Sequence, residues 1–281
     1  MRGRTPVPLA GARVVVTGGG SGIGKRMAVE AASRGATVII WELSADAAEA
    51  TRSLIERARG TAEVQVVDVS DEAQVNHAAA RAGAVDVLIN NAGIVTGAAL
   101  IDNTSDSIRR TFDINVLALY WTTRAVLPGM LERNRGVVVN VASAAGLVGV
   151  ARQTDYSASK FAVVGFTESL RAELRATPGC DVGTMLVCPY YIDTGMFDGV
   201  RTRFPLLLPI LKEVDVADAI INGIESRREQ YIAPRLARWV PVMRVLPTCV
   251  FDRVMDFFGI NHTMDHFVGR RGGVEGTADG C

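Results

Sequence analysis

The chain has 281 residues, of which 48% are hydrophobic and 21% are charged, so a globular protein with a sizeable core is expected. Lysine and arginine number 30, as do aspartate and glutamate, and the zero net charge without any basic block argues against nucleic-acid binding. No apolar run is long enough to predict a transmembrane helix, and the first residues do not resemble a signal peptide.

A glycine-rich turn follows the first predicted strand. Residues 13–17 form a β-branched run that is typical of a buried parallel strand, and it ends at the glycines of residues 18–24. Residues 25–34 then have the pattern of an amphipathic helix. Glycines let the backbone approach a pyrophosphate, and a helix N-terminus offers free N–H groups and a positive dipole end. Such turns also join strands to helices without any ligand, but strand, turn and helix together favour a dinucleotide site.

Residues 36–41 are the second predicted strand, and Glu42 follows at its carboxyl end. An acidic residue at this place accepts hydrogen bonds from the adenosine ribose hydroxyls and repels a 2′-phosphate, which favours NAD over NADP. No basic residue in the glycine turn or directly after Glu42 offers a partner for that phosphate. The alternative is that Glu42 merely begins the next helix.

Strands and helices continue to alternate. We predict helices at residues 45–59 and 71–81 and strands at residues 62–67 and 85–89. This rhythm predicts an α/β fold with a doubly wound parallel sheet. Ligands of such sheets lie at the carboxyl ends of the strands, and Glu42, Asp68 and Asn91 all fall there.

Tyr156 and Lys160 are four residues apart in a segment, 155–177, that is predicted to be a long helix, so they share one face. A free phenol has a pKa near ~10, and a cation within about 4–6 Å stabilises the phenolate and lowers that pKa toward working pH. Alone, this pair is a common feature of helix surfaces. With the other motifs, it predicts an acid/base centre.

These motifs together resemble the single-domain short-chain dehydrogenases/reductases over about residues 11–235. The resemblance rests on residues 17–24, on Asn90-Asn91-Ala92-Gly93, on Ser143 after a strand, and on Tyr156-x-x-x-Lys160. It implies one NAD-binding oxidoreductase domain of the Rossmann type at residues 1–270, with a C-terminal helical extension. The sequence around Trp41-Glu42 and the tail are similar to the branch that includes retinol and 17β-hydroxysteroid dehydrogenases.

The resemblance also implies roles for particular residues. Tyr156 is the expected general acid/base, Lys160 the residue that lowers its pKa and binds the nicotinamide ribose, and Ser143 the partner of the substrate oxygen. Asn115 is expected to hold a proton-relay water. The implied cofactor contacts are Gly18, Gly20, Ser21, Gly22, Ile23, Gly24, Glu42, Asp68, Val69, Asn91, Ala92, Gly93, Tyr156, Lys160, Pro189, Ile192 and Thr194.

No metal is required by this chemistry. His262 and His266 lie four residues apart on a predicted helix, but a third ligand is not evident, so a surface or interface role is favoured.

One position departs from the family pattern. The family usually has Pro-Gly after its sixth strand, which is predicted here at residues 182–187, whereas this chain has Pro189-Tyr190. Tyrosine does not adopt a positive φ as cheaply as glycine. Either the loop runs differently, or Tyr190 lines the nicotinamide side of the pocket.

The second half of the chain holds the residues that face the substrate. Residues 195–212 are strongly apolar and resemble a lid, which favours a lipophilic substrate such as a long-chain alcohol, terpenoid, retinoid or steroid. Alternatively, their leucines pack on the protein or on another subunit. Residues 230–233 are a predicted edge strand. Three interpretations of the extension, about residues 235–270, are open: an added helical lid, an oligomer contact, or an amphipathic segment on a membrane surface. We favour packing on the protein. Residues 271–281 are expected to be disordered.

The sequence thus predicts an NAD-dependent enzyme that interconverts alcohols and carbonyls. The alternatives are an NAD-binding regulatory protein of the same fold, or an epimerase or dehydratase that uses bound NAD. The family resemblance implies a homodimer or homotetramer. Four cysteines without paired spacing are consistent with reduced thiols and a cytoplasmic location, with peripheral membrane contact as the minority alternative.

Overall fold

The computed structural model describes residues 6–269, and within them one seven-stranded sheet has the order β3-β2-β1-β4-β5-β6-β7. All neighbouring strands are parallel, which confirms the predicted doubly wound α/β fold. The strands are β1 (Arg13–Thr17), β2 (Thr37–Glu42), β3 (Thr61–Val66), β4 (Val87–Asn90), β5 (Gly136–Val141), β6 (Val182–Pro189) and β7 (Gln230–Ala233).

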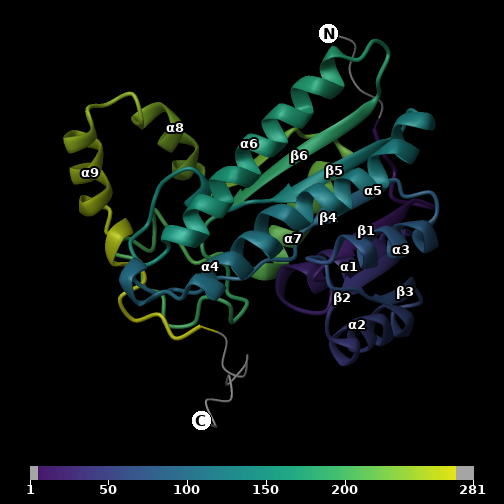
Figure 1. The fold of residues 1–281 in the computed structure, drawn as a ribbon, viewed down its shortest axis with the longest axis horizontal. Coiled ribbons are helices and arrows are strands. Elements are labelled where there is room, and N and C mark those ends of the chain that lie inside the picture. The colour runs from purple at the N-terminus through teal and green to yellow at the C-terminus, as the bar shows by residue number, and fades with distance from the viewer. Residues whose placement is uncertain (1–5, 270–281) are drawn as a thin grey trace.

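Helices cover both faces of the sheet (Figure 1). On one face α1 packs against α7 and α2, and on the other α3 packs against α5, while α6 crosses β5 and β6. The helices are α1 (Gly22–Ser33), α2 (Ala45–Arg57), α3 (Glu72–Ala82), α4 (Ser105–Phe112), α5 (Ala118–Glu132), α6 (Thr154–Ala176), α7 (Glu213–Glu225), α8 (Val240–Met243) and α9 (Thr248–Phe257).

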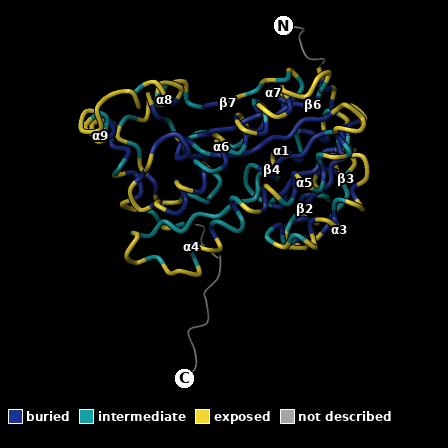
Figure 2. Tube along the Cα trace, turned by 45° about the horizontal axis from the view of Figure 1, so that its top comes forward, coloured by how far each residue is buried: buried dark blue, intermediate teal, exposed yellow. Residues whose placement is uncertain are grey.

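The central strands are buried on both faces (Figure 2). Val14 and Val16 face the cluster under α1 and α7, whereas Val15 faces the cluster under α3 and α5. A strand covered on both sides has no solvent face, which is why its sequence is a continuous β-branched run instead of an alternating one.

Several element boundaries differ from the predictions. Helix α1 begins at Gly22, so Gly22 and Gly24 lie in its first turn instead of in the preceding loop. The predicted helix carrying His262 and His266 is wrong, because the chain forms a short 3-10 turn at Ile260–His262 and then further turns. The expectation of disorder at residues 271–281 lies outside the described residues.

The C-terminal extension lies at one end of the molecule, away from α2 and α3 (Figure 1). Its buried residues Met255, Ile260 and Met264 belong to the same apolar cluster as Tyr156 and Tyr191. The extension therefore packs directly against the part of the protein that carries the predicted catalytic tyrosine.

Candidate active site

A cavity of about 290 Å³ lies at the carboxyl ends of the central strands. The predicted site residues that line it are Gly18, Ser21, Gly22, Ile23, Glu42, Asp68, Val69, Asn91, Ala92, Gly93, Ser143, Tyr156, Lys160, Pro189, Ile192 and Thr194. Three predicted residues do not line it: Gly20, Gly24 and Asn115. Their contacts show that they support the residues that do.

The glycine turn is packed so closely that side chains do not fit. A Cβ at Gly24 would overlap the carbonyl oxygen of Gly18 and the side-chain amide of Asn91. Gly18 itself has a φ of +63°, which L side chains rarely adopt. The first turn of α1 carries no acidic residue, so its N–H groups and dipole favour an anion in the cavity. This cradle fits the pyrophosphate of a dinucleotide.

Glu42 is the last residue of β2, and its carboxylate braces the glycine turn. Its Oε2 accepts a hydrogen bond from the backbone N–H of Gly20 at 2.9 Å, and its Oε1 accepts one from Leu43 N–H at 2.9 Å. A Cβ at Gly20 would lie 2.8 Å from the Glu42 side chain. Helix α2 starts only at Ala45, after the N-cap Ser44, so the alternative that Glu42 begins that helix is wrong.

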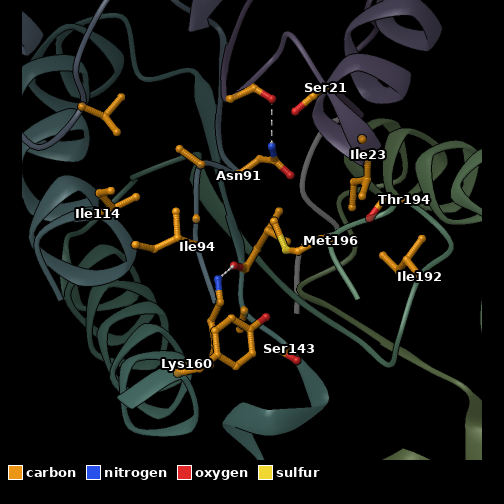
Figure 3. A pocket seen from close by; sticks show the side chains of 18 of the residues that line it. Ser21, Ile23, Asn91, Ile94, Ile114, Ser143, Lys160, Ile192, Thr194 and Met196 are labelled. Atoms are coloured by element: carbon orange, nitrogen blue, oxygen red, sulfur yellow. Dashed lines mark hydrogen bonds between the residues drawn. The ribbon is translucent and has the colours of Figure 1, made fainter. Parts of the chain in front are cut away.

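Asn91 ties the end of β4 to the end of β1 (Figure 3). Its Nδ2 donates to the carbonyl oxygens of Thr17, at 3.0 Å, and Gly18, at 3.3 Å, while its backbone N–H donates to Thr17 Oγ1 at 2.9 Å. These bonds hold the floor of the cavity at the point where two strands end.

Asn115 lies behind the cavity, in a π-helical turn at Asp113–Leu117, an irregularity that is common at functional sites. Its Oδ1 accepts from Ile94 N–H at 2.8 Å, and its Nδ2 donates to Ile94 O at 2.9 Å and to Ser159 Oγ at 3.0 Å. The amide thus joins the loop after β4 to α6, next to Gly93, where a Cβ would lie 3.1 Å from Asn115 Oδ1 and 3.4 Å from Lys160 Nζ.

Ser143, Tyr156 and Lys160 all line the cavity, and Figure 3 shows Ser143 and Lys160 close together at one end of it. Tyr156 and Lys160 are both buried in the first two turns of α6, and Lys160 Nζ lies 5.6 Å from the centre of the Tyr156 ring. Nζ donates a hydrogen bond to Val141 O at 3.0 Å, which fixes the ammonium beneath β5. The side chain of Ser143 is hydrogen-bonded to the Tyr156 phenol.

Burial controls the acidity of both groups. It raises the pKa of the Tyr156 phenol, and the hydrogen bond to Ser143 lowers it only in part. This direction is opposite to the lowered phenol pKa expected from the sequence, because burial is the largest of the effects on this group. Burial also lowers the pKa of Lys160 from 10.5 to about 8. At neutral pH the phenol keeps its proton and most of the lysine is charged.

Tyr190 occupies the place where the family usually has glycine. Its φ is not positive, and its backbone N–H donates to Ala233 O at 2.8 Å, so the strand direction continues through it. Its side chain lines the cavity. The structure agrees with the second of the two expectations for this residue, because Tyr190 forms part of the pocket wall.

Two buried residues beside Tyr156 were missed by sequence reasoning. Asp155 accepts hydrogen bonds from Thr96 Oγ1, at 2.8 Å to its Oδ2, and from Thr111 Oγ1, at 2.9 Å. Gln153 is 1% exposed and donates to the sulfur of Met264. Polar residues within three positions before the predicted catalytic Tyr156 were the available signal, but their partners are far away in the sequence.

A parallel Rossmann sheet with a glycine cradle, and with serine, tyrosine and lysine at the end of its cavity, defines a nicotinamide-dependent oxidoreductase. The family described as short chain dehydrogenase matches residues 12–203. The chain belongs to this family. This confirms the predicted family, fold and enzyme class.

Similar proteins extend the likeness beyond the family match. The chain is 35% identical to "Short-chain dehydrogenase/reductase family 16C member 6" of Bos taurus, covering 93% of this chain and 85% of that protein. It is 36% identical to "Epidermal retinol dehydrogenase 2" of Mus musculus, covering 94% and 87%. A solved short-chain dehydrogenase/reductase from Burkholderia phymatum in complex with NAD is 30% identical, with a TM-score of 0.77 over 85% of this chain and 95% of that one. The likeness to the retinol dehydrogenase branch is thereby confirmed.

Two further features of residues 6–269 bear on the expected chemistry and location. None of their helices is both long enough and apolar enough to cross a membrane. Nor does this part of the chain contain three or more His, Cys, Asp or Glu grouped as metal ligands. His262 instead contacts Asp265, with 3.2 Å between Nδ1 and Oδ2.

Proposed function

We propose that this protein transfers hydride between NAD and a lipophilic alcohol or its carbonyl product. The observation that carries the proposal is the convergence of Ser143, Tyr156 and Lys160 on a cavity whose other end is the glycine cradle and Glu42. The relatives named retinol dehydrogenases support a substrate of the retinoid kind, meaning a primary or secondary alcohol on a long apolar skeleton.

The cofactor contacts follow from the cavity walls. The glycine turn and the start of α1 bind the pyrophosphate, Asp68 and Val69 contact the adenine, and the residues from Pro189 to Thr194 contact the nicotinamide side. Glu42 favours NAD, because its carboxylate lies at the end of β2 and repels a 2′-phosphate. The solved relative in complex with NAD supports the same choice.

The proton chemistry belongs to the chain's own residues. The bound nicotinamide ring supplies or accepts the hydride. In carbonyl reduction the protonated phenol of Tyr156 donates its proton to the substrate oxygen, which Ser143 holds by a hydrogen bond. In alcohol oxidation the phenolate takes the hydroxyl proton, and the charge of Lys160 stabilises that phenolate. Asn115 helps to position Tyr156 and Lys160, because it fixes the loop at Ile94 against α6, which carries both residues.

The substrate end of the cavity is apolar. Ile94, Ile114, Met196 and Phe197 line it, which suits a hydrocarbon skeleton. We propose that residues 195–212 and the extension form the cover over this end. Within the cover, Leu208 is 6% exposed and packs inward, whereas Leu206 is 99% exposed. The expectation that its leucines pack on the protein thus holds for some of them and not for others.

The assembly and location are part of the same proposal. Leu117, Tyr120 and Leu131 are exposed apolar residues on or next to α5, which supports a homodimer or homotetramer formed through α5 and α6. We expect a cytoplasmic protein, with Trp239 and Val245 of the extension available for peripheral membrane contact. Light scattering tests the assembly, and a carbonate wash of membranes tests the location.

The function is tested by NAD reduction with a panel of lipophilic alcohols, with NADP in parallel. Tyr156→Phe is expected to lower turnover by about 10²–10⁴-fold while the affinity for NAD changes little. Comparable turnover in that variant would refute the mechanism. NAD binding without NADH release from any alcohol would favour the regulatory or epimerase alternatives instead.

A further inference from the structure

A second, smaller cavity opens behind the catalytic residues. Its volume is about 30 Å³, and Ser143 and Tyr156 line both this niche and the main cavity. The rest of its wall is Ala144, Ala145, Val148, Val150, Gln153, Tyr190, Tyr191, Phe197 and Ile260. A space of this size holds about one water molecule or one hydroxyl group. The niche is therefore too small for a hydrocarbon skeleton but large enough for a single oxygen.

Two buried polar atoms of the niche residues have no hydrogen-bond partner among the described residues. They are Oε1 of Gln153 and the hydroxyl of Tyr190. Burial raises the pKa of Tyr190, so its hydroxyl stays protonated and can both donate and accept. An unpartnered buried polar group costs roughly 1–3 kcal/mol, and the wall is otherwise mostly apolar. An acceptor and a hydroxyl in one niche match a hydroxyl group of a ligand.

The other polar atom of Gln153 is already used. Its Nε2 donates to Met264 Sδ at 3.0 Å, and its side chain is also hydrogen-bonded to Tyr191. Exchanging the amide oxygen and nitrogen would leave an N–H instead of an oxygen without a partner. Both orientations suit a ligand hydroxyl, because a hydroxyl donates and accepts.

We propose that this niche binds a second hydroxyl group of the substrate, so that the preferred substrates are lipophilic diols or hydroxy-carbonyl compounds. The reacting oxygen lies at Ser143 and Tyr156, while the second hydroxyl donates to Gln153 and accepts from Tyr190. Only the first oxygen exchanges a proton with Tyr156, and its carbon loses or gains the hydride. The second hydroxyl is bound without being oxidised. This inference rests on the proposed function, because it assigns a substrate class to the same site.

The test compares alcohols that differ only in the second hydroxyl. Values of kcat/KM with NAD are measured for a C10 secondary mono-alcohol and for C10 diols in which the second hydroxyl is moved along the chain. The wild-type enzyme is expected to prefer one diol by roughly tenfold, the effect of one or two net hydrogen bonds. Gln153→Leu and Tyr190→Phe are each expected to reduce this preference severalfold. The preference is measured as the ratio of kcat/KM for the diol to kcat/KM for the mono-alcohol, so a change common to both substrates cancels. Tyr120→Phe, which removes a hydroxyl from an exposed tyrosine, is the matched control.

Equal activity on the mono-alcohol and on every diol would overturn the proposal, as would variants that slow both substrates equally. Binding to the Tyr156→Phe protein with NAD, measured by calorimetry, separates the niche from catalysis. If the wild-type enzyme forms no NADH from any alcohol, a diol preference in this binding experiment still supports the niche, and the proposed function alone is refuted. Equal binding of both ligands means that the niche holds only water. If Gln153→Leu fails to fold, Tyr190→Phe, which removes a single oxygen, still decides the matter.

Discussion

Replacing Asp155 with alanine is expected to destabilise the protein more than replacing an exposed carboxylate residue with alanine does. Asp155 is buried at the start of α6, directly before Tyr156. It accepts from Thr96, in the loop after β4, and from Thr111, in α4. One side chain thus joins three segments around the substrate end of the cavity.

The magnitude follows from the number of donors. Each threonine hydroxyl has one hydrogen. Thr96 donates its hydrogen to the carboxylate, whereas Thr111 shares its hydrogen between Asp155 Oδ2, at 2.9 Å, and the carbonyl oxygen of Ser107, at 3.0 Å. Hydrogen bonds to a charged group contribute about 1.5–3 kcal/mol each, so one full and one shared bond give about 2–5 kcal/mol for Asp155→Ala. Both threonines reach the same oxygen, Oδ2, so the amide oxygen of Asp155→Asn can accept both bonds without the charge. A neutral hydrogen bond contributes roughly half as much as one to a charged group, so about half of that loss is expected. The free energy of unfolding is measured by urea denaturation with far-UV circular dichroism.

The matched control is Asp106→Ala. The Asp106 side chain is 95% exposed and pairs with Arg109 at 3.1 Å, so its loss is expected to cost less than about 1 kcal/mol. A loss for Asp155→Ala that equals the control value would show that the three segments do not depend on this carboxylate. An equally large loss for Asp155→Asn and Asp155→Ala would show that the negative charge, and not the number of acceptors, is what matters.

Three other predictions concern the cofactor site. Burial lowers the pKa of Lys160 from 10.5 to about 8, so protonation of this lysine opposes folding as the pH falls through that window. The free energy of unfolding of Lys160→Met, measured by urea unfolding at each pH, should therefore rise relative to the wild type by about 3 kcal/mol as the pH falls from 10.5 to 8. Gly24→Ala should lower NAD affinity and melting temperature, because its Cβ would overlap the backbone of Gly18. Gly165→Ala, with open space around it, should lower neither. Equal effects of the two substitutions would contradict the close packing of the glycine turn as the basis of NAD binding. Glu42→Ala should lower the NAD:NADP ratio of kcat/KM by roughly tenfold, and an unchanged ratio would mean that the carboxylate does not select the cofactor.

The sheet and the cofactor cradle were predictable because their physical causes are local. Buried parallel strands require continuous apolar runs, and a glycine cradle requires glycine where no Cβ fits. The edge strand Gln230–Ala233 was confirmed with both boundaries correct. The start of α1 was not, because a helix that begins within a glycine run looks like a loop from its composition alone.

The direction of the pKa shift of Tyr156 was not predictable in the same way. The spacing of Tyr156 and Lys160 is a local property, but burial is set by segments far away in the sequence. Tyr156 packs against Phe197, with ring centres 5.9 Å apart, and its cluster includes Ile260 and Met264 of the extension. These contacts remove water from the phenol and raise its pKa. The sequence motif identifies the titratable groups, whereas the residues packed around them determine their pKa values.

The substrate wall follows from the same reasoning. The family match ends at residue 203, yet Tyr191 is hydrogen-bonded to Thr263 at 2.8 Å, and Gln153 to Met264 at 3.0 Å. The chain separations of these two bonds are 72 and 111 residues. Under the proposed function, the acid/base chemistry would therefore come from residues inside the family match, while the extension holds Tyr191 and Gln153 in place. Thr263→Val, which removes the hydrogen bond to Tyr191, should change the ratio of kcat/KM between alcohols of the panel more than the pH profile of kcat, because that bond reaches Tyr191 and not Tyr156. An unchanged ratio would contradict this assignment.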